Sequence, residues 1–596
     1  MKLKSLLYIA ASFPMLAGLS ACMDFDTPSD EFAENEKSVD VTVFKGMPDS
    51  LNYEYQPDEE RVNIAVDSLT DCFDQMITAM YYVVGGKDGA LPQEHQWQYI
   101  YALSTDNYCG YHCLINSKFM QGIINNTYAY ERCYSEGPYG RYLSMKAYLG
   151  NLLNHNCSNS VVEIKAIALL LFNIVAQENT DIYGAIPYVD HRGNKEKNPF
   201  AFNKGVDTYY TIIDNLDKII EVFENFNNRP QWYKDRIQEL LFWTDMLSTT
   251  KSIDEWKRCA ASIKLRMAMH LVKYNPEDAK RFAEEAVATG VVSTIDQQIG
   301  VGTFSGLITM HPLKVIFNDW NDSRLNASFI SILKSLNHPY LEYLIGKNSN
   351  QIVNEKTNAV MDPQTDIVGV RAGLMMEPSQ QYFSNMRVAY SQPDMMCDDF
   401  LLGPEYVVKL AEIEFLRAEG ALRGWNMGGT AEYFYNEGIR HADMSDPGMF
   451  SENYSSRVDD YMAQTSATPY TYVDPMDDAN NIASVTNIGV KWDDSDDNET
   501  KLEKIITQKY IAIYPNSYEA WTELRRTGYP KIFPVLNPTV DNDGSLAFGD
   551  LIRRMRLPHG DLEAGKADIT NTGLDALGGP DVIATRVFWD IPTGNF

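Results

Sequence analysis

The 596-residue chain is short of positive charge. It holds 51 lysines and arginines against 81 aspartates and glutamates, which gives a formal net charge of −30. A surface with such an excess of negative charge repels polyanions. Nucleic acid and heavily sulfated glycans are therefore poor partners, whereas neutral or cationic ligands are tolerated.

Long apolar runs are also scarce, because after the N-terminus no segment reaches the length of a membrane-spanning helix. At the N-terminus, Lys2 and Lys4 precede an apolar run over 6–19 that is too short and too interrupted to remain as a permanent span. The run ends in Leu-Ser-Ala before Cys22, the pattern of a lipoprotein cleavage site. An ordinary secretory cleavage fits less well, because the cysteine stands where the cut would fall. We therefore predict a signal peptide over 1–21 and acylation of Cys22.

The segment that follows the predicted acylated cysteine, 22–57, is polar and acidic and lacks a helical or strand period. We interpret it as a flexible tether between lipid and a folded body over 58–596. Loss of 1–21 removes two lysines and makes the mature chain two units more negative.

Cysteine is rare, with eight in the whole chain. Acylation of Cys22 leaves seven, an odd number that cannot all pair, so we expect unpaired or partly paired core cysteines. Cys109 and Cys113 flank His112, but their spacing is not that of a zinc site and no second pair follows. We predict no metal.

Catalytic motifs are missing as well. The chain has no nucleophile elbow, zinc-protease motif, phosphate loop or dinucleotide fingerprint. Its 81 carboxylates could supply a glycosidase pair by chance. We predict a protein that is not an enzyme and uses no cofactor, with a hydrolase as the minor alternative.

What the sequence does contain is helical periodicity. Apolar residues at helical spacing predict helix hairpins over 403–442 and 255–290, and a third pair over 158–179 and 207–225. In the second hairpin, Asn275, Pro276 and Gly290 suit a cap, a first turn and a stop. The stretches 295–400 and 443–498 have little helical period. Loops of such length usually build a site, so we expect a mainly α protein in which a helical scaffold carries an irregular, loop-rich lobe.

Five segments of the chain are distinctive: 414–419 (EFLRAE), 509–521 (KYIAIYPNSYEAW), 525–530 (RRTGYP), 319–328 (DWNDSRLNAS) and the tail from 553–558 (RRMRLP) to 588–590 (FWD). They resemble segments of the SusD/RagB family of outer-membrane nutrient-binding lipoproteins. With the lipoprotein cleavage site, the likeness covers nearly the whole mature chain. The family's "DPR" element is replaced here by 337–340 (NHPY).

The resemblance implies one globular body with about four tetratricopeptide-like helix pairs and a loop-rich ligand face. It implies a lipid-anchored, cell-surface protein of the outer membrane that captures oligosaccharide for a SusC-like TonB-dependent transporter. A peptide-binding RagB-like importer subunit and a surface adhesin or scaffold are the alternatives. The net charge favours a neutral oligosaccharide over an acidic one.

Sugar recognition needs flat aromatics for the C–H faces and amide, carboxylate or guanidinium groups for the hydroxyls. Two segments interpreted as loops offer both, and the Ser-Thr-Asp stretch over 104–106 matches the family's border of the ligand site. The candidates are Trp97, Asp106, Asn107, Tyr108 and Tyr111 in the first segment and Trp320, Asn321 and Arg324 in the second. Packing beneath the site is the alternative for the first group, and for Arg324 the alternative is pinning the loop.

Overall fold

The structure is a computed structural model of the whole chain, and it describes the following residues: 58–80, 93–116, 128, 132–155, 160–189, 201–301, 311–348, 350–353, 358, 360–364, 366–377, 379–394, 397, 405–443, 451–538, 545–558 and 569–596. Cys22, the signal peptide and the tether lie outside the described residues. No helix in the described ranges combines the length and apolarity needed to cross a membrane.

Helices dominate the described chain, as predicted. The longer ones are α3 (Glu59–Ala79), α6 (Arg132–Asn154), α7 (Val162–Tyr183), α8 (Gly205–Asn225), α9 (Gln231–Thr244), α10 (Ile253–His270), α11 (Pro276–Thr289), α14 (Gln380–Ala389), α16 (Leu410–Leu422), α17 (Ala431–Arg440), α20 (Asn498–Ala512) and α21 (Ser517–Thr527). Consecutive helices pack as pairs: α7 with α8, α10 with α11, and α16 with α17, while α20 packs mainly against α16. The expected helix-pair scaffold is confirmed.

Local sequence explains these pairs. The side chain of Asn275 accepts from the Asp278 backbone N–H, Pro276 begins α11 and Gly290 ends it, as the sequence predicted. In α7 nearly every side chain is buried, so this helix lies inside the helical half rather than on its surface. In α17, a Cβ at Gly438 would lie 2.8 Å from the Phe415 ring of α16, so glycine allows these two helices to approach.

The hairpin over 403–442 departs from prediction at its start. Tyr406 does not begin a helix: it lies in strand β8 (Glu405–Val408), which pairs antiparallel with β4 (Ile299–Val301). Tyr406 pairs with Gly300, so the apolar period of the first helix begins at Leu410 instead. A short strand contributes apolar residues that can continue a helical pattern by coincidence, which explains the error.

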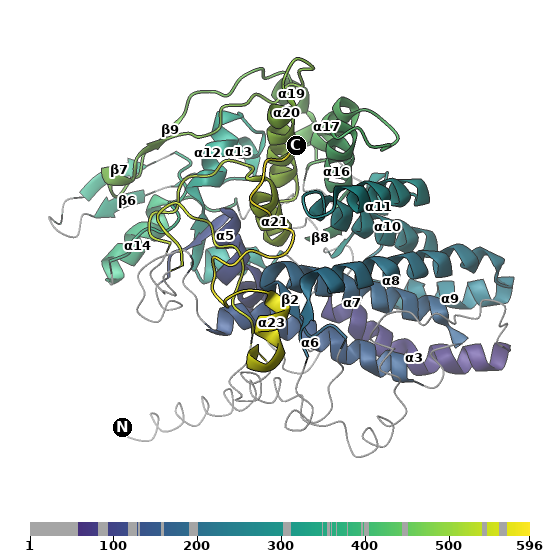
Figure 1. Cartoon of the computed structure of the whole chain (residues 1–596). Helices are drawn as coiled ribbons and strands as arrows, with labels where there is room; N and C mark the ends of the chain where they lie inside the picture. Colours follow the sequence, from purple (N-terminus) through teal and green to yellow (C-terminus); the bar gives the residue numbers. More distant parts are fainter. Residues whose placement is uncertain are drawn as a thin grey trace, which may run out of the picture.

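The stretches 295–400 and 443–498 form the irregular lobe that the sequence predicted. Its strands are β5 (Ser323–Leu325), β6 (Asn350–Val353), β7 (Val360–Gln364), β9 (Thr471–Tyr472) and β10 (Ile482–Ala483), and its helices include η9 (Val315–Asp319), α12 (Ala327–Ser335), α13 (Tyr340–Tyr343) and α14. Figure 1 shows α12–α14 and β6–β7 on one side of the molecule and α3 and α6–α11 on the other, with α20 and α21 between them. In the described ranges every sheet has two strands.

The segment over 97–111 is helical, and its interpretation as a loop was wrong. It forms the end of α4 (Gln93–Trp97), the π-helix η3 (Gln98–Thr105) and α5 (Asp106–Cys109), ending at Gly110 with a φ of +82°. Its apolar side chains alternate with aromatics in a way that hid the helical period. Burial of Ile100, Ala102 and Leu103 in the core shows why the segment coils inward.

Candidate functional site

The two candidate segments are neighbours in space. Strand β1 (His112–Leu114), directly after the first segment, pairs antiparallel with β5, so that Cys113 lies opposite Arg324. The Gln98 side-chain amide also donates to the Asp322 carboxylate at 2.9 Å. The structure therefore joins residues more than 200 positions apart around one part of the molecule.

The five candidates of the first segment are buried, and Asp106 and Asn107 are bonded to structural partners. Asp106 Oδ2 lies 2.7 Å from His112 Nδ1, and the His112 ring reaches the Tyr514 hydroxyl at 2.9 Å. The Asn107 side chain bridges two backbone groups, the Ala102 carbonyl and the Leu114 N–H. These contacts favour packing beneath a site for Asp106 and Asn107.

The aromatic members of that segment are equally enclosed. Tyr108 is 3% exposed and its ring lies 5.3 Å from that of Trp521, while Tyr111 is fully buried and donates to the Tyr510 carbonyl. Trp97 makes an edge contact with His311 at 5.1 Å between ring centroids. Direct ligand contact through these rings stays a prediction that their burial does not favour.

The second segment lies at the surface. Trp320 and Asn321 are half-buried, and the Trp320 ring lies 4.6 Å from the His95 ring. Asn321 has a φ of +54°, which asparagine tolerates better than most residues, and its amide donates to the Asn318 carbonyl. Asn321 Oδ1 in turn accepts from Arg324 Nη2 at 3.0 Å.

Arg324 pins this loop, as the alternative predicted, and also lines a cavity. Its guanidinium donates to the carbonyls of Phe317, Ser323 and Arg387, which ties η9 to α14. Burial, helped by the neighbouring Arg387, lowers the pKa of Arg324 to about 9.

The cavity beside Arg324 encloses about 310 Å³ and is called the α14 pocket below. It is lined by Asn321, Arg324, Lys347, Asn348, Ser384, Arg387, Val388, Tyr390, Ser391 and Gln392. Two of the eight predicted site residues, Asn321 and Arg324, line it, and Trp320 directly precedes them.

Eight lining residues were missed by sequence reasoning, although all fall within the irregular region over 295–400. One signal was present. The stretch 379–393 contains an arginine and no acidic residue, in a chain with 81 acidic residues. Such a local absence of negative charge could have directed attention to α14.

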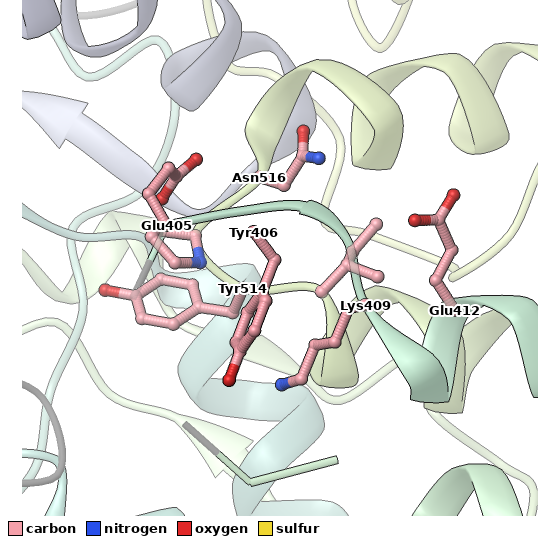
Figure 2. A pocket seen from close by; sticks show the side chains of 8 residues that line it. Glu405, Tyr406, Lys409, Glu412, Tyr514 and Asn516 are labelled. Carbon is pink, nitrogen blue, oxygen red and sulfur yellow. The ribbon is translucent and has the colours of Figure 1, made fainter. Parts of the chain in front are cut away.

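A second cavity is too small for a sugar. It encloses about 10 Å³, roughly the room that one water needs. Figure 2 shows its lining side chains, which come from β8 and the start of α16 on one side and from 513–516 on the other. Burial raises the pKa of the Glu405 carboxyl and lowers that of Lys409 to about 8. Because Lys409 donates to the carbonyls of Ala442 and Ala512, we interpret this cavity as a structural joint.

The family-like motifs meet in a buried ion network, defined here as Glu419 of α16, Lys509 of α20, and Glu519, Glu523 and Arg526 of α21. Lys509 Nζ lies 2.7 Å from Glu519 and 2.8 Å from Glu523, and Arg526 binds both oxygens of Glu419. Glu519, Glu523 and the adjacent His270 are spaced like metal ligands. Lys509 already pairs with both of these carboxylates and Arg526 pairs with Glu523, which argues for a structural role.

Cys72, Cys109, Cys113 and Cys259 are free thiols, as predicted. Cys109, Cys113 and Cys259 are buried, and Cys72 is half-buried. Burial raises the pKa of the Cys109 thiol well above its usual value, so it is a core residue rather than a nucleophile. The side chains of Cys133 and Cys157 lie outside the described residues.

Comparison with known proteins decides the family. The family model described as "SusD-like: Susd and RagB outer membrane lipoprotein" matches 51–590. The chain belongs to the SusD/RagB family. SusD-like proteins are binding proteins, and the family is one of outer-membrane lipoproteins.

Solved structures agree with this assignment. A chitin-binding SusD homologue from Flavobacterium johnsoniae is 29% identical, with a TM-score of 0.73 over 89% of this chain and 100% of its own. Two SusD homologues from Bacteroides thetaiotaomicron are 27% and 26% identical, each with a TM-score of 0.69, and the alignments cover 87% and 88% of this chain and 98% and 99% of theirs. No curated protein matches the chain.

Proposed function

We propose that this protein is a lipid-anchored, cell-surface subunit that captures oligosaccharide and delivers it to a SusC-like TonB-dependent transporter. The observation that carries the proposal is the α14 pocket. Its volume of about 310 Å³ falls at the lower end of the range of ligand pockets, roughly 300–1000 Å³. Its lining combines amides, hydroxyls and cations next to the half-buried Trp320.

Binding without hydrolysis follows from the same lining. Hydrolysis of a glycosidic bond usually needs two carboxylates flanking the bond. Among the lining residues that the structure describes, none is an aspartate, glutamate, histidine or cysteine. The chitin-binding relative from Flavobacterium johnsoniae further supports a saccharide ligand over the peptide alternative.

The test is calorimetric titration of the purified mature chain with neutral, acidic and sulfated oligosaccharides, chitin oligosaccharides among them, and with a peptide digest. We expect at least one saccharide to bind and to be recovered uncleaved from the titrated sample. Cleavage products would contradict the non-enzymatic role. Binding confined to peptides would favour the RagB-like alternative.

Surface anchoring is tested separately. Cys22→Ala removes the residue proposed to carry the acyl chains, so the protein should move from the detergent phase to the aqueous phase. Unchanged partitioning would contradict the lipid anchor. Affinity purification of the wild type from outer membranes should recover a TonB-dependent barrel, and a failure to do so would favour the adhesin alternative.

A further inference from the structure

We propose that the α14 pocket recognises an acidic group, a carboxylate or sulfate, carried by the captured saccharide. This inference rests on the proposed function and narrows its substrate class. It replaces the expectation of a neutral ligand, which was drawn from the net charge of the whole chain.

The first observation is the sign of the pocket. Among the described residues that line it, three are cations, Arg324, Lys347 and Arg387, and none is acidic. In the whole chain, acidic residues outnumber basic ones by 81 to 51. The pocket therefore reverses the charge balance of the protein that contains it.

The second observation is that no carboxylate of the described residues neutralises these charges. No ion pair joins any of the three to a carboxylate among the described residues. Arg324 is 3% exposed, yet its guanidinium donates only to backbone carbonyls and to the Asn321 amide. A cation removed from water without a counter-ion is costly, and an anion bound beside it would offset that cost.

An arginine bonded to carbonyls is not by itself a site. Arg371 also donates to two carbonyls, those of Asn480 and Pro534, and lines neither of the two cavities described here. What distinguishes Arg324 is the pair of further cations around the same cavity, contributed by two other segments of the chain.

The third observation is that the cationic segments are held in place. Arg324 Nη2 donates to the carbonyl of Arg387 at 2.8 Å. Asn348, next to Lys347, donates to the carbonyl of Ala389 at 2.6 Å. Both bonds fix the backbone at the C-terminal end of α14, where cations are also favoured by the helix dipole. The backbone that carries the exposed side chains of Lys347 and Arg387 is therefore held in a fixed position.

The fourth observation points to a saccharide as the carrier of the acid. Asn348 Oδ1 and Gln392 Oε1 are buried acceptors with no hydrogen-bond donor among the described residues. A buried acceptor without a hydrogen bond is unfavourable, and a sugar hydroxyl could donate a hydrogen bond to each of these amide oxygens. An inorganic anion would satisfy the cations and leave these amide oxygens unmet.

The negative net charge of the chain does not prevent an acidic sugar unit from binding in the pocket. Exposed charges are screened over about 8 Å at physiological ionic strength. A polyanion spreads its charge over the acidic surface and is repelled, whereas one acidic sugar unit interacts mainly with the nearest three cations.

The experiment compares matched ligand pairs by calorimetric titration. One pair is a uronic-acid oligosaccharide and the same oligosaccharide with its carboxylates reduced to alcohols. The other is a sulfated oligosaccharide and its desulfated form, so the pairs also separate the two sources of negative charge. We expect at least one acidic member to bind about tenfold or more tightly than its neutral partner, and the preference to shrink at high salt.

Arg387→Gln and Lys347→Gln assign the preference to the pocket, because both side chains are exposed and their loss spares the core. Each variant should lose about tenfold more affinity for the acidic ligand than for its neutral partner. Lys280→Gln is the matched control, since Lys280 is exposed on α11 in the helical half (Figure 1).

The outcomes separate the inference from the function on which it rests. Equal affinity for both members of every pair, or an unchanged preference in the Arg387→Gln Lys347→Gln double variant, overturns the inference and leaves saccharide capture standing. Absence of binding to any saccharide, or binding confined to acidic peptides, overturns both.

Discussion

The buried ion network and the α14 pocket use the same kinds of side chain in opposite ways. In the network, Lys509 and Arg526 each contact two carboxylates, and the cluster lies between helices that are far apart in sequence. In the pocket, Arg324 is as deeply buried but meets carbonyls, and its cationic neighbours Lys347 and Arg387 reach solvent.

This difference separates structural charge from functional charge. A cation whose carboxylate partners are supplied by the chain can fix the position of helices but has little left to offer a ligand. A cation whose partners are only carbonyls keeps most of its field for an anion from outside. The network therefore belongs to the scaffold and the pocket to recognition.

The largest expected effect comes from breaking the network. Glu419→Gln removes the carboxylate that binds both Arg526 and Arg423, and leaves these two guanidinium groups short of a counter-ion. Removing one partner of a buried pair typically costs about 3–5 kcal/mol of unfolding free energy. Denaturant titration at pH 7 measures it.

The control is Arg387→Gln in the pocket, which should change the unfolding free energy by no more than about 0.5 kcal/mol, as surface substitutions usually do. Equal destabilisation by the two variants would remove the distinction between the two regions.

Acid should weaken the network without needing a mutation. Burial raises the pKa of the Glu419 carboxyl, but Arg526 and Arg423 lower it by more, so that the pKa is about 2. A carboxyl whose folded pKa lies below its unfolded value stabilises the fold above the unfolded value, about 4.5, and this contribution is lost as pH falls toward 2. The stability gap between wild type and Glu419→Gln, measured at pH 7, 4 and 3, should therefore narrow. A gap that stayed constant would show that Glu419 is not ionised in the fold.

His270 limits the stability of the fold at high pH. Burial lowers its pKa, but Glu519 and Asp181 raise it to about 9. A histidine with a raised folded pKa stabilises below its unfolded value, near 6.5, and loses that contribution as pH rises through 9. The combined contribution of these two groups is therefore fullest between about pH 5 and 6.5.

The scaffold could be predicted from sequence and the pocket could not. Helix pairs such as 255–290 carry their own signals, because Asn275, Pro276 and Gly290 specify local backbone geometry. The recognised motifs over 414–419 and 509–530 marked the network, although nothing in their sequence showed that Glu419 meets Arg526. Such contacts depend on packing between helices about 100 residues apart.

The prediction of the site residues failed for a related reason. Aromatic and polar residues over 97–111 have the composition of a sugar-binding loop, but composition does not reveal burial. Residues that line the pocket come from three separate segments, and the cations among them are ordinary surface residues when read one at a time. Only Asn321 and Arg324 could be placed, because their segment borders the pocket, Asn321 half-buried and Arg324 buried.

The sharpest contrast within the candidate site comes from Trp320→Ala. Trp320 is half-buried and packs against the His95 ring at the edge of the core, so its loss should cost on the order of 1 kcal/mol of unfolding free energy. If its ring stacks on the captured sugar, affinity should fall by about 1–3 kcal/mol in calorimetric titration. Tyr108→Ala is the counterpart: its ring is buried against Trp521, so it should cost about 3–5 kcal/mol of stability. If Trp320→Ala keeps wild-type affinity, the sugar stacks on a different aromatic side chain of the lobe. If Tyr108→Ala is stable but no longer binds, the first segment contacts the ligand after all.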